Sequence, residues 1–433
     1  MSVDTSIAAL FLAAVLLRGA TRLWLAGRQL AAVRARRSSV PPMFAGAITT
    51  ADHEKAADYA AARMHSARVG AVTGAVVALA LTFGGGVAAV DAAWRQTALA
   101  QPWLGTAVVL SVLALLQAVE LPFAIWRTFG LESRFGFNRT SPRLFAADFV
   151  KRLAIGAVIV APLAAAAIAL MQHAGRWWWV AAWAGWLCAT LALTWAWPRL
   201  VAPLFNRFAP LDDPVLETRI ASLVRRCGFA SDGVFVMDGS RRSARGNAYF
   251  TGVGRSKRIV FFDTLLARLG AAEVEAVLAH ELGHFRLNHI RRRFIAASLS
   301  ALAGFGLLAW LAARPGFYAA LGVPIASEHA ALLLFVILVP AFTFFATPVL
   351  SAWSRRHELE ADDFAVRYTS ADALSNALIK IYRDNGSNVA PDRLYSAFYD
   401  SHPPALERVA RLKALTGGPA PARPGRPQPA VLQ

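Results

Sequence analysis

The sequence contains few cysteines and few charged residues for its length. Only two cysteines, Cys188 and Cys227, occur among 433 residues, so neither a disulfide framework nor a cysteine-based metal site is expected. Charged residues make up 17% of the chain and hydrophobic residues 56%, which excludes an ordinary soluble domain and makes a membrane protein the first expectation.

The hydrophobic residues concentrate in long runs. A helix needs about 20 mostly apolar residues to cross a bilayer, and we predict seven such spans. They cover residues 6–26, 69–90, 104–125, 153–172, 177–197, 293–313 and 329–352. Arg18 and Arg22 interrupt the first span, and Glu120 lies within the third. Intramembrane charges usually face a bundle interior, but Glu120 is also compatible with a helix end near Pro122.

The net charge of +18 reflects an uneven distribution of Lys and Arg. Basic residues are scarce in every second connection between spans and abundant in the others. The positive-inside rule then places the N-terminus outside and the C-terminus in the cytoplasm, and an odd number of spans agrees with this. Because these residues flank apolar spans, we expect the lipid bilayer as their partner and no nucleic acid.

Residues 280–284 read His-Glu-Leu-Gly-His, an H-E-x-x-H pattern. On a helix, His280 and His284 share a face and can bind one Zn²⁺ between them. Glu281 is close enough to take a proton from a metal-bound water. The alternative is an amphipathic helix with two surface histidines, but the flanking residues are apolar, and unpaired histidines there would be costly.

Two histidines are insufficient, because a catalytic zinc usually has three protein ligands and a water. The metzincin pattern would place a glycine at position 287 and a histidine at 290, but the chain has Leu287 and Ile290, which excludes that subclass. His289 follows His280 by nine residues, about half a turn out of phase on a helix. We therefore expect His289 to point away from the metal and to be structural.

A carboxylate beyond the last two spans can complete the site. These spans form a hairpin that returns the chain to the same membrane face near residue 353, where Glu358 is the first acidic residue. Glu358 and Asp362 share a helix face. We predict Glu358 as the third ligand and Asp362 as a carboxylate that orients a ligand histidine. The alternative is a charged helix leaving the membrane, with Arg355 and Arg356 at lipid headgroups; the H-E-x-x-H pattern favours the ligand.

These patterns divide the chain into six parts. The segment 198–292 is long enough for a small cytoplasmic catalytic domain, with strands predicted at Gly233–Asp238, Asn247–Thr251 and Arg258–Phe262 and the metal helix at about 272–288. The parts are 1–68, a first span and a helical segment; 69–197, spans two to five with a loop at 126–152; 198–292, the catalytic domain; 293–352, the hairpin; 353–415, helices with the third ligand; and 416–433, a disordered tail.

Several short motifs occur in order between about residues 50 and 412. They are Leu121-Pro-Phe, Gly136-Phe-Asn, Ala202-Pro-Leu-Phe-Asn-Arg-Phe208, Asp238-Gly-Ser-Arg-Arg-Ser243, Asn247-Ala-Tyr-Phe, Lys257-Arg-Ile-Val-Phe-Phe-Asp-Thr-Leu-Leu266, His280-Glu-Leu-Gly-His284, Glu358-Leu-Glu-Ala-Asp362 and His402-Pro-Pro-Ala-Leu-Glu-Arg408. With these motifs the chain resembles the type I CAAX prenyl endopeptidases. The resemblance implies a mainly α polytopic membrane protein, with seven transmembrane helices around a chamber and a zincin-like domain containing a small β-sheet.

The resemblance also implies roles for individual residues. One zinc per chain would be bound by the predicted ligands, with Glu281 as general base. Asn247 and Ala248 would lie on an edge strand that pairs with an extended substrate. His402 would help to stabilise the oxyanion, and Arg408 would support the site from the following helix. Arg245-Gly246 stands where eukaryotic members are expected to have His-Ser, so local substrate contacts are expected to differ.

The expected function is therefore a zinc-dependent membrane endopeptidase. It would hydrolyse peptide bonds near the C-terminus of prenylated CAAX-type or other membrane-associated protein substrates. The Ala- and Arg-rich composition suggests a bacterial inner membrane, where prenylated proteins are not expected, so we favour a broader specificity. The alternative is a non-enzymatic chaperone or lipid-binding scaffold that uses the same chamber.

Overall fold

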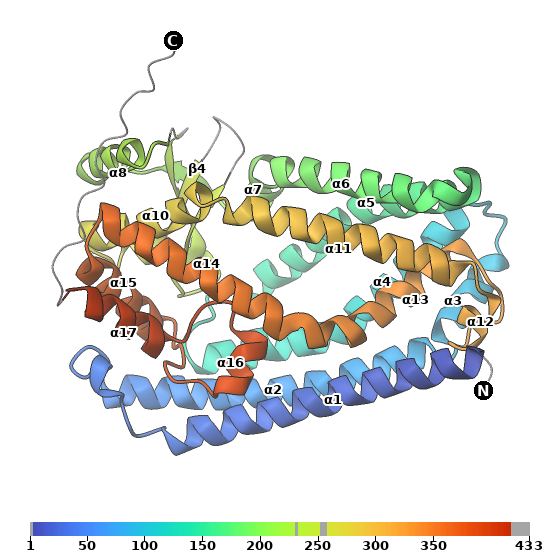
Figure 1. Cartoon of the computed structure of the whole chain (residues 1–433), viewed down its shortest axis with the longest axis horizontal. Coiled ribbons are helices and arrows are strands. Elements are labelled where there is room, and N and C mark those ends of the chain that lie inside the picture. The colour runs from blue at the N-terminus through green and yellow to red at the C-terminus, as the bar shows by residue number, and fades with distance from the viewer. Residues whose placement is uncertain (1–2, 230–232, 252–257, 417–433) are drawn as a thin grey trace, which may run out of the picture.

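The computed structural model describes residues 3–229, 233–251 and 258–416. Long helices lie alongside one another and a smaller domain covers one end of them (Figure 1). Within these described residues, seven helices are long and apolar enough to cross a membrane, which confirms the predicted number of spans. They are built from α1 Val3–Ala35, α2 Thr50–Leu81, α4 Trp103–Ile125, α5 Pro142–His173, α6 Trp178–Ala196, α11 His289–Ala312, and α13 Glu328–Thr343 with α14 Thr347–Tyr368.

Shorter helices connect and cap these spans. They are α3 Gly86–Arg95, α7 Ala202–Phe205, α8 Pro214–Arg226, α9 Asp263–Leu266, α10 Ala271–Arg286, α12 Pro315–Ala319, α15 Ala371–Asp384, α16 Arg393–Tyr399 and α17 Ala405–Thr416. Two π-helical segments, Trp126–Glu132 and Trp197–Val201, extend α4 and α6. Glu120, near the end of α4, forms an ion pair with Arg127 at 3.0 Å, and both side chains are about half exposed.

The second span differs from its predicted range of 69–90. Helix α2 continues the hydrophilic segment into the apolar run and ends at Leu81. Three glycines follow at 84–86, and Gly85 has a φ of 71°, a left-handed conformation that glycine adopts without a steric penalty. The chain turns there, and the last predicted residues of the span form the start of α3.

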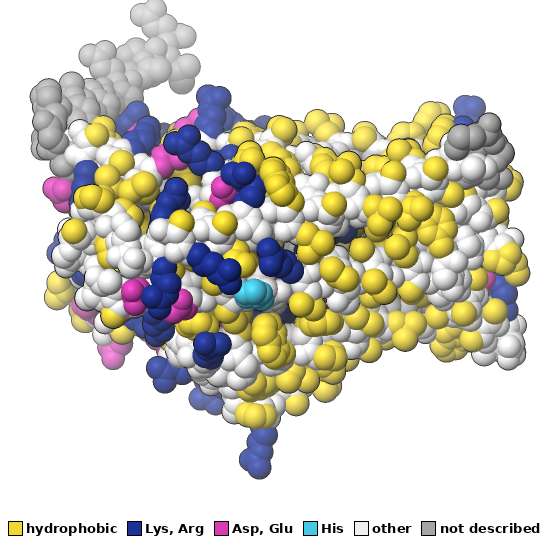
Figure 2. Space-filling view, turned by 90° about the horizontal axis from the view of Figure 1, so that it is seen from below, with side chains coloured by type: hydrophobic (Ala, Val, Ile, Leu, Met, Phe, Trp, Pro, Cys, Tyr) yellow, Lys and Arg dark blue, Asp and Glu magenta, His cyan; other side chains and the backbone are white. Residues whose placement is uncertain are grey.

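The membrane helices surround a core of their own. Phe11 of α1, Val108 of α4 and Leu334 of α13 are fully buried and belong to one hydrophobic cluster. On the molecular face of Figure 2, hydrophobic side chains cover most of the length, whereas Lys and Arg gather over the end that holds the smaller domain. This distribution is expected for a protein with one end in water and the rest in lipid.

The smaller domain contains a four-stranded sheet in the order β1-β2-β4-β3. Strands β2 Val234–Met237, β3 Ala248–Thr251 and β4 Arg258–Phe262 confirm the three predicted strands, and β1 Phe208–Pro210 was not predicted. Strands β2 and β4 are parallel, whereas β1 and β3 are antiparallel to their neighbours, which makes β3 an edge strand. The predicted glycine-rich turn after β3 and the predicted tail lie outside the described residues, apart from Thr416 at the end of α17.

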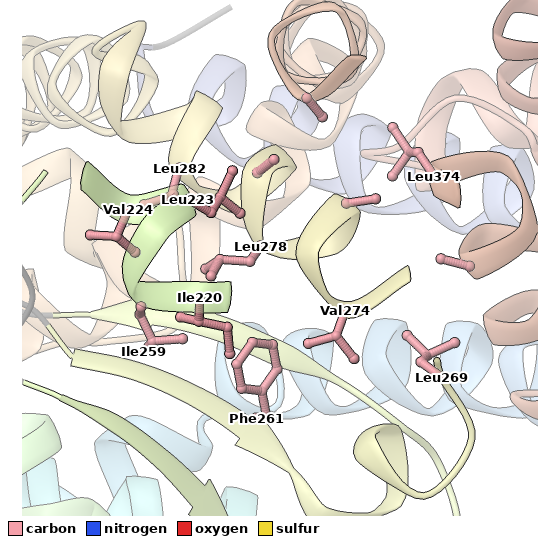
Figure 3. Packing of buried hydrophobic residues seen from close by; sticks show 14 of the residues in the cluster. Ile220, Leu223, Val224, Ile259, Phe261, Leu269, Val274, Leu278, Leu282 and Leu374 are labelled. Atoms are coloured by element: carbon pink, nitrogen blue, oxygen red, sulfur yellow. The ribbon is translucent and has the colours of Figure 1, made fainter. Parts of the chain in front are cut away.

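Helix α10 packs on this sheet through a single face. Val274, Leu278 and Leu282 recur every fourth residue and are buried, as expected for one stripe of a helix. Figure 3 shows them against Ile220 and Leu223 of α8 and against Ile259 and Phe261 of β4. The packing fixes the rotation of α10 about its axis, and so decides where its histidines point.

Candidate metal centre and active site

Helix α10 carries the H-E-x-x-H residues. At its start, Glu273 accepts a hydrogen bond from the backbone N–H of Gly270 at 2.8 Å and another from Lys380 Nζ at 2.8 Å. The helix ends at Arg286. His280 and His284 therefore lie one turn apart on the same face, and their Nε2 atoms are 3.2 Å from each other.

Glu358 on α14 completes a triangle of donor atoms. Its Oε2 is 3.3 Å from His280 Nε2, and its Oε1 is 3.4 Å from His284 Nε2. A tetrahedral zinc with ligands at 2.0–2.1 Å places its ligand atoms about 3.3 Å apart. Glu358 is 3% exposed, and its Oε2 has no hydrogen-bond donor among the described residues. A buried carboxylate oxygen without a partner is costly, so these residues fit a divalent cation.

The approach of α10 to α14 depends on Gly283. A Cβ at this position would lie 3.2 Å from both Cα and O of Ala361, and 3.2 Å from Cβ of Phe364. These contacts are shorter than ordinary carbon–carbon contacts of about 3.5–4.0 Å. Glycine therefore permits the close packing that brings Glu358 to the two histidines.

Two further residues fix the orientation of the His280 ring. Asp362 lies 2.8 Å from His280 Nδ1 through Oδ1 and accepts its N–H when Nε2 faces the metal. Arg408 of α17 donates to both oxygens of Asp362, at 2.6 and 2.5 Å. Asp362 and Arg408 are 1% and 5% exposed. The structure thus places both residues where the sequence analysis expected a supporting carboxylate and a supporting arginine.

His289 lies outside the group formed by His280, His284 and Glu358, as expected for a structural residue, but it contacts His284, so the prediction of its orientation was wrong. It assumed one continuous helix, but α10 ends at Arg286, and Asn288 adopts a left-handed conformation with φ 59° before α11 begins. The turn brings His289 Nδ1 to 3.1 Å from His284 Nδ1. An asparagine shortly after a helical run is a known helix-ending residue and could have indicated this turn.

A cavity of about 840 Å³ opens onto the metal centre. Its lining includes Glu281, His402 and Arg408, together with Asn247 and Ala248 at the edge strand. His402 Nε2 lies 3.4 Å from Glu358 Oε2, and the His402 side chain is 62% exposed to this space. Burial raises the pKa of Glu281, while the neighbouring histidines lower it. A carboxylate with a raised pKa can accept a proton and release it again near neutral pH.

No pattern in the sequence indicated which contacts hold the wall of the cavity opposite the metal centre. Arg245 forms an ion pair with Glu132 at 2.9 Å, and it also donates to the hydroxyl of Tyr59. The guanidinium lies 4.5 Å from the ring centre of Phe137. Arg245 was singled out only as a departure from eukaryotic sequences. Its partners come from distant segments, so no local pattern could have identified them.

Comparison with known proteins agrees with this geometry. Residues 29–207 match the family described as CAAX prenyl protease N-terminal, five membrane helices, and residues 210–416 match peptidase family M48. The CAAX prenyl protease 1 homolog of Arabidopsis thaliana is 36% identical over 302 residues, 70% of each chain. CAAX prenyl protease 1 of Saccharomyces cerevisiae is 34% identical over 68% of each chain. The crystal structure of S. mikatae Ste24p superposes with a TM-score of 0.86 at 26% identity, covering 95% of this chain and 99% of that one.

Proposed function

We propose that this chain, which belongs to peptidase family M48, is a zinc endopeptidase. It cleaves extended C-terminal segments of membrane-associated proteins, and prenylated CAAX proteins are among these substrates. It is an integral multi-pass membrane protein and a metalloendopeptidase. The observation that carries the zinc proposal is the convergence of His280, His284 and Glu358: the two Nε2 atoms lie 3.2 Å apart, and the two carboxylate oxygens of Glu358 lie 3.3 and 3.4 Å from one each of them.

The proposed chemistry assigns one task to each residue. A zinc ion held by the triangle would polarise the peptide carbonyl and make a coordinated water acidic. Glu281 accepts a proton from the attacking water and delivers it to the leaving amine nitrogen. His402 reaches the same cavity and donates a hydrogen bond to the developing oxyanion. Asp362 and Arg408 keep His280 oriented throughout.

The edge strand supports binding of an extended peptide. Phe262 N–H donates to Asn247 O at 3.0 Å, so Asn247 is a hydrogen-bonded position of the β3–β4 pair. Ala248, opposite Phe261, is the next position, and its N–H and C=O point away from β4. The Ala248 N–H donates to Asn247 Oδ1 at 2.9 Å, a bond that a substrate carbonyl would replace. Both residues line the cavity. A substrate strand added there would place successive backbone groups along the metal centre.

The cavity supports a substrate that comes from the membrane or from the cytoplasm. Its lining combines Tyr59 and Met64 of the long helix α2 with residues of the smaller domain. Charge distribution supports a cytoplasmic catalytic end, because Lys and Arg gather there (Figure 2). A bacterial inner membrane, as suggested by composition, would supply membrane proteins rather than prenylated ones, so prenylation is accepted but not required in this proposal.

The test uses detergent-purified protein with one farnesylated C-a-a-X peptide and its non-prenylated twin. Mass spectrometry identifies the products, zinc content is measured, and Glu281→Gln is the control. We expect zinc in both proteins, cleavage of both peptides by the wild type, and a loss of about 10²–10⁴-fold in Glu281→Gln. Cleavage restricted to the farnesylated peptide would refute the broad specificity. Bound zinc without cleavage of either peptide would favour the chaperone or scaffold alternative.

A further inference from the structure

A second group of histidines lies directly behind the metal ligand His284. His289 Nδ1 is 3.1 Å from His284 Nδ1, and His289 Nε2 is 3.0 Å from Glu360 Oε2. The ring of His357 stacks on that of His289, with centroids 4.0 Å apart and an interplanar angle of 9°. His289 and His357 are each 1% exposed. The arrangement fixes the position and the plane of His289.

The hydrogen bonds determine which nitrogens carry protons. With His284 Nε2 facing the metal, its Nδ1 must carry the hydrogen of the neutral ring. This N–H donates to His289 Nδ1, which leaves the hydrogen of His289 on Nε2, where it donates to Glu360. Every ring nitrogen of His284 and His289 then has a partner. This series of hydrogen bonds runs from His284 through His289 and ends on the carboxylate of Glu360.

Arg356 holds that carboxylate at the far end. It donates from Nε to Glu360 Oε1 at 3.0 Å, four residues along the same helix. Glu360 is 32% exposed in its side chain, while His289 shields the interior from solvent. Glu360 is therefore linked to His284 through the one buried ring of His289.

His289, His357 and Glu360 also lie close enough to one another to hold a second metal ion. The Nδ1 of buried His357 has no hydrogen-bond partner among the described residues, which favours that interpretation. The proton count opposes it, because a metal on His289 Nε2 would displace the hydrogen donated to Glu360 and leave an imidazolate. Positive charge also opposes a second metal ion. The charge of Arg293 disfavours a cation at His357, and Arg356 already forms an ion pair with Glu360.

We propose that His289 and Glu360 are positioning residues for His284, with His357 holding the plane of His289. The proposal rests on the proposed zinc site. His280 receives its orienting carboxylate directly from Asp362, whereas His284 receives it from Glu360 through His289. Both ligand rings are thereby fixed in the tautomer that directs Nε2 to the metal.

The test compares four variants in detergent: His289→Phe, His289→Asn, Glu360→Gln and His357→Phe. Phenylalanine at 289 keeps the ring but removes both nitrogens. Asparagine restores an acceptor near the place of Nδ1. Glu360→Gln is nearly isosteric and partly exposed, so it tests the series even if a change at 289 disturbs folding. His357→Phe keeps the stacked ring but removes its nitrogens, so it tests whether they hold a second ion.

The measurements are metal affinity by chelator competition, the visible spectrum of the Co²⁺-loaded protein, and kcat and KM separately. We expect His289→Phe to bind the metal about 10–100-fold more weakly and to lose kcat with KM unchanged. Glu360→Gln should change the Co²⁺ spectrum in the same direction, and His289→Asn should recover part of the affinity. His357→Phe should still bind one ion per chain.

Three results would overturn the proposal. One is wild-type affinity and an unchanged Co²⁺ spectrum in both His289→Phe and Glu360→Gln. Another is an equal loss in His357→Phe, which would indicate general packing. The third is two ions per wild-type chain with one of them lost in His357→Phe, which would assign a second metal site. Failure of the proposed function is distinguishable, because the wild type itself would then bind no metal or cleave nothing.

Discussion

Replacing Gly283 with alanine is expected to separate α10 from α14 and weaken metal binding. The new Cβ would lie 3.2 Å from Cα and O of Ala361. Ordinary contacts need about 3.5–4.0 Å, so α14 must move by about 0.3–0.8 Å. Metal–ligand distances tolerate only about ±0.2 Å. Because Ala361 lies three residues from Glu358 on the same helix, the displacement reaches the third ligand.

Helix propensity makes the opposite prediction. Alanine is favoured over glycine inside a helix by about 1 kcal/mol, so α10 alone would be stabilised. We expect the steric effect to prevail at the metal centre, with at least a tenfold loss of affinity, or about 1.4 kcal/mol. Chelator competition on purified protein measures that loss, and peptide cleavage measured alongside it should fall with metal occupancy.

Gly304→Ala is the matched control. A Cβ there would meet only the ring of Phe335, at 3.8 Å, far along α11 from the ligands. It should leave metal affinity unchanged. If Gly283→Ala bound the metal as tightly as the wild type and unfolded at a higher temperature, the argument that close helix packing sets the donor triangle would be refuted.

Three further predictions concern other parts of the molecule. Arg408→Met should cost about 3–5 kcal/mol, because buried Asp362 keeps His280 but loses its cation. Arg408→Met with Asp362→Leu should recover part of the thermal stability but not metal affinity, since His280 loses its acceptor. Ala248→Pro removes an N–H that points away from β4, so it should raise KM for extended peptides while kcat and folding persist. In a Cys188→Ser background, Cys227 should resist maleimide near neutral pH until the protein is denatured, because it is 2% exposed and burial raises its thiol pKa to about 11.

Much of the fold could be predicted from the sequence because the relevant patterns are local. Each span is a single apolar run, and His280 and His284 are related by one helical turn. Glu358 could be predicted because a two-span hairpin must return to the face it left. These arguments need only helix geometry and the thickness of a bilayer.

The remaining features depend on where helices end and on contacts between residues that are far apart in the sequence. The end of α2 is set by the glycines at 84–86, within an otherwise apolar run. The orientation of His289 was predicted wrongly because the left-handed Asn288 resets the helical phase. Strand β1 is three residues long and includes Pro210, so its pairing with β2 leaves no local pattern. Arg245 finds Glu132 from a segment more than a hundred residues away.

The three donor residues are divided between the two ends of a membrane hairpin. His280 and His284 precede α11, and Glu358 follows α13 on α14. During synthesis the histidines emerge first, and the carboxylate reaches them only after two further helices have crossed the bilayer. The nascent protein is therefore without a complete centre until insertion is finished. With the proposed ligand set, proteolytic activity is expected only after both helices of this hairpin have been made and inserted.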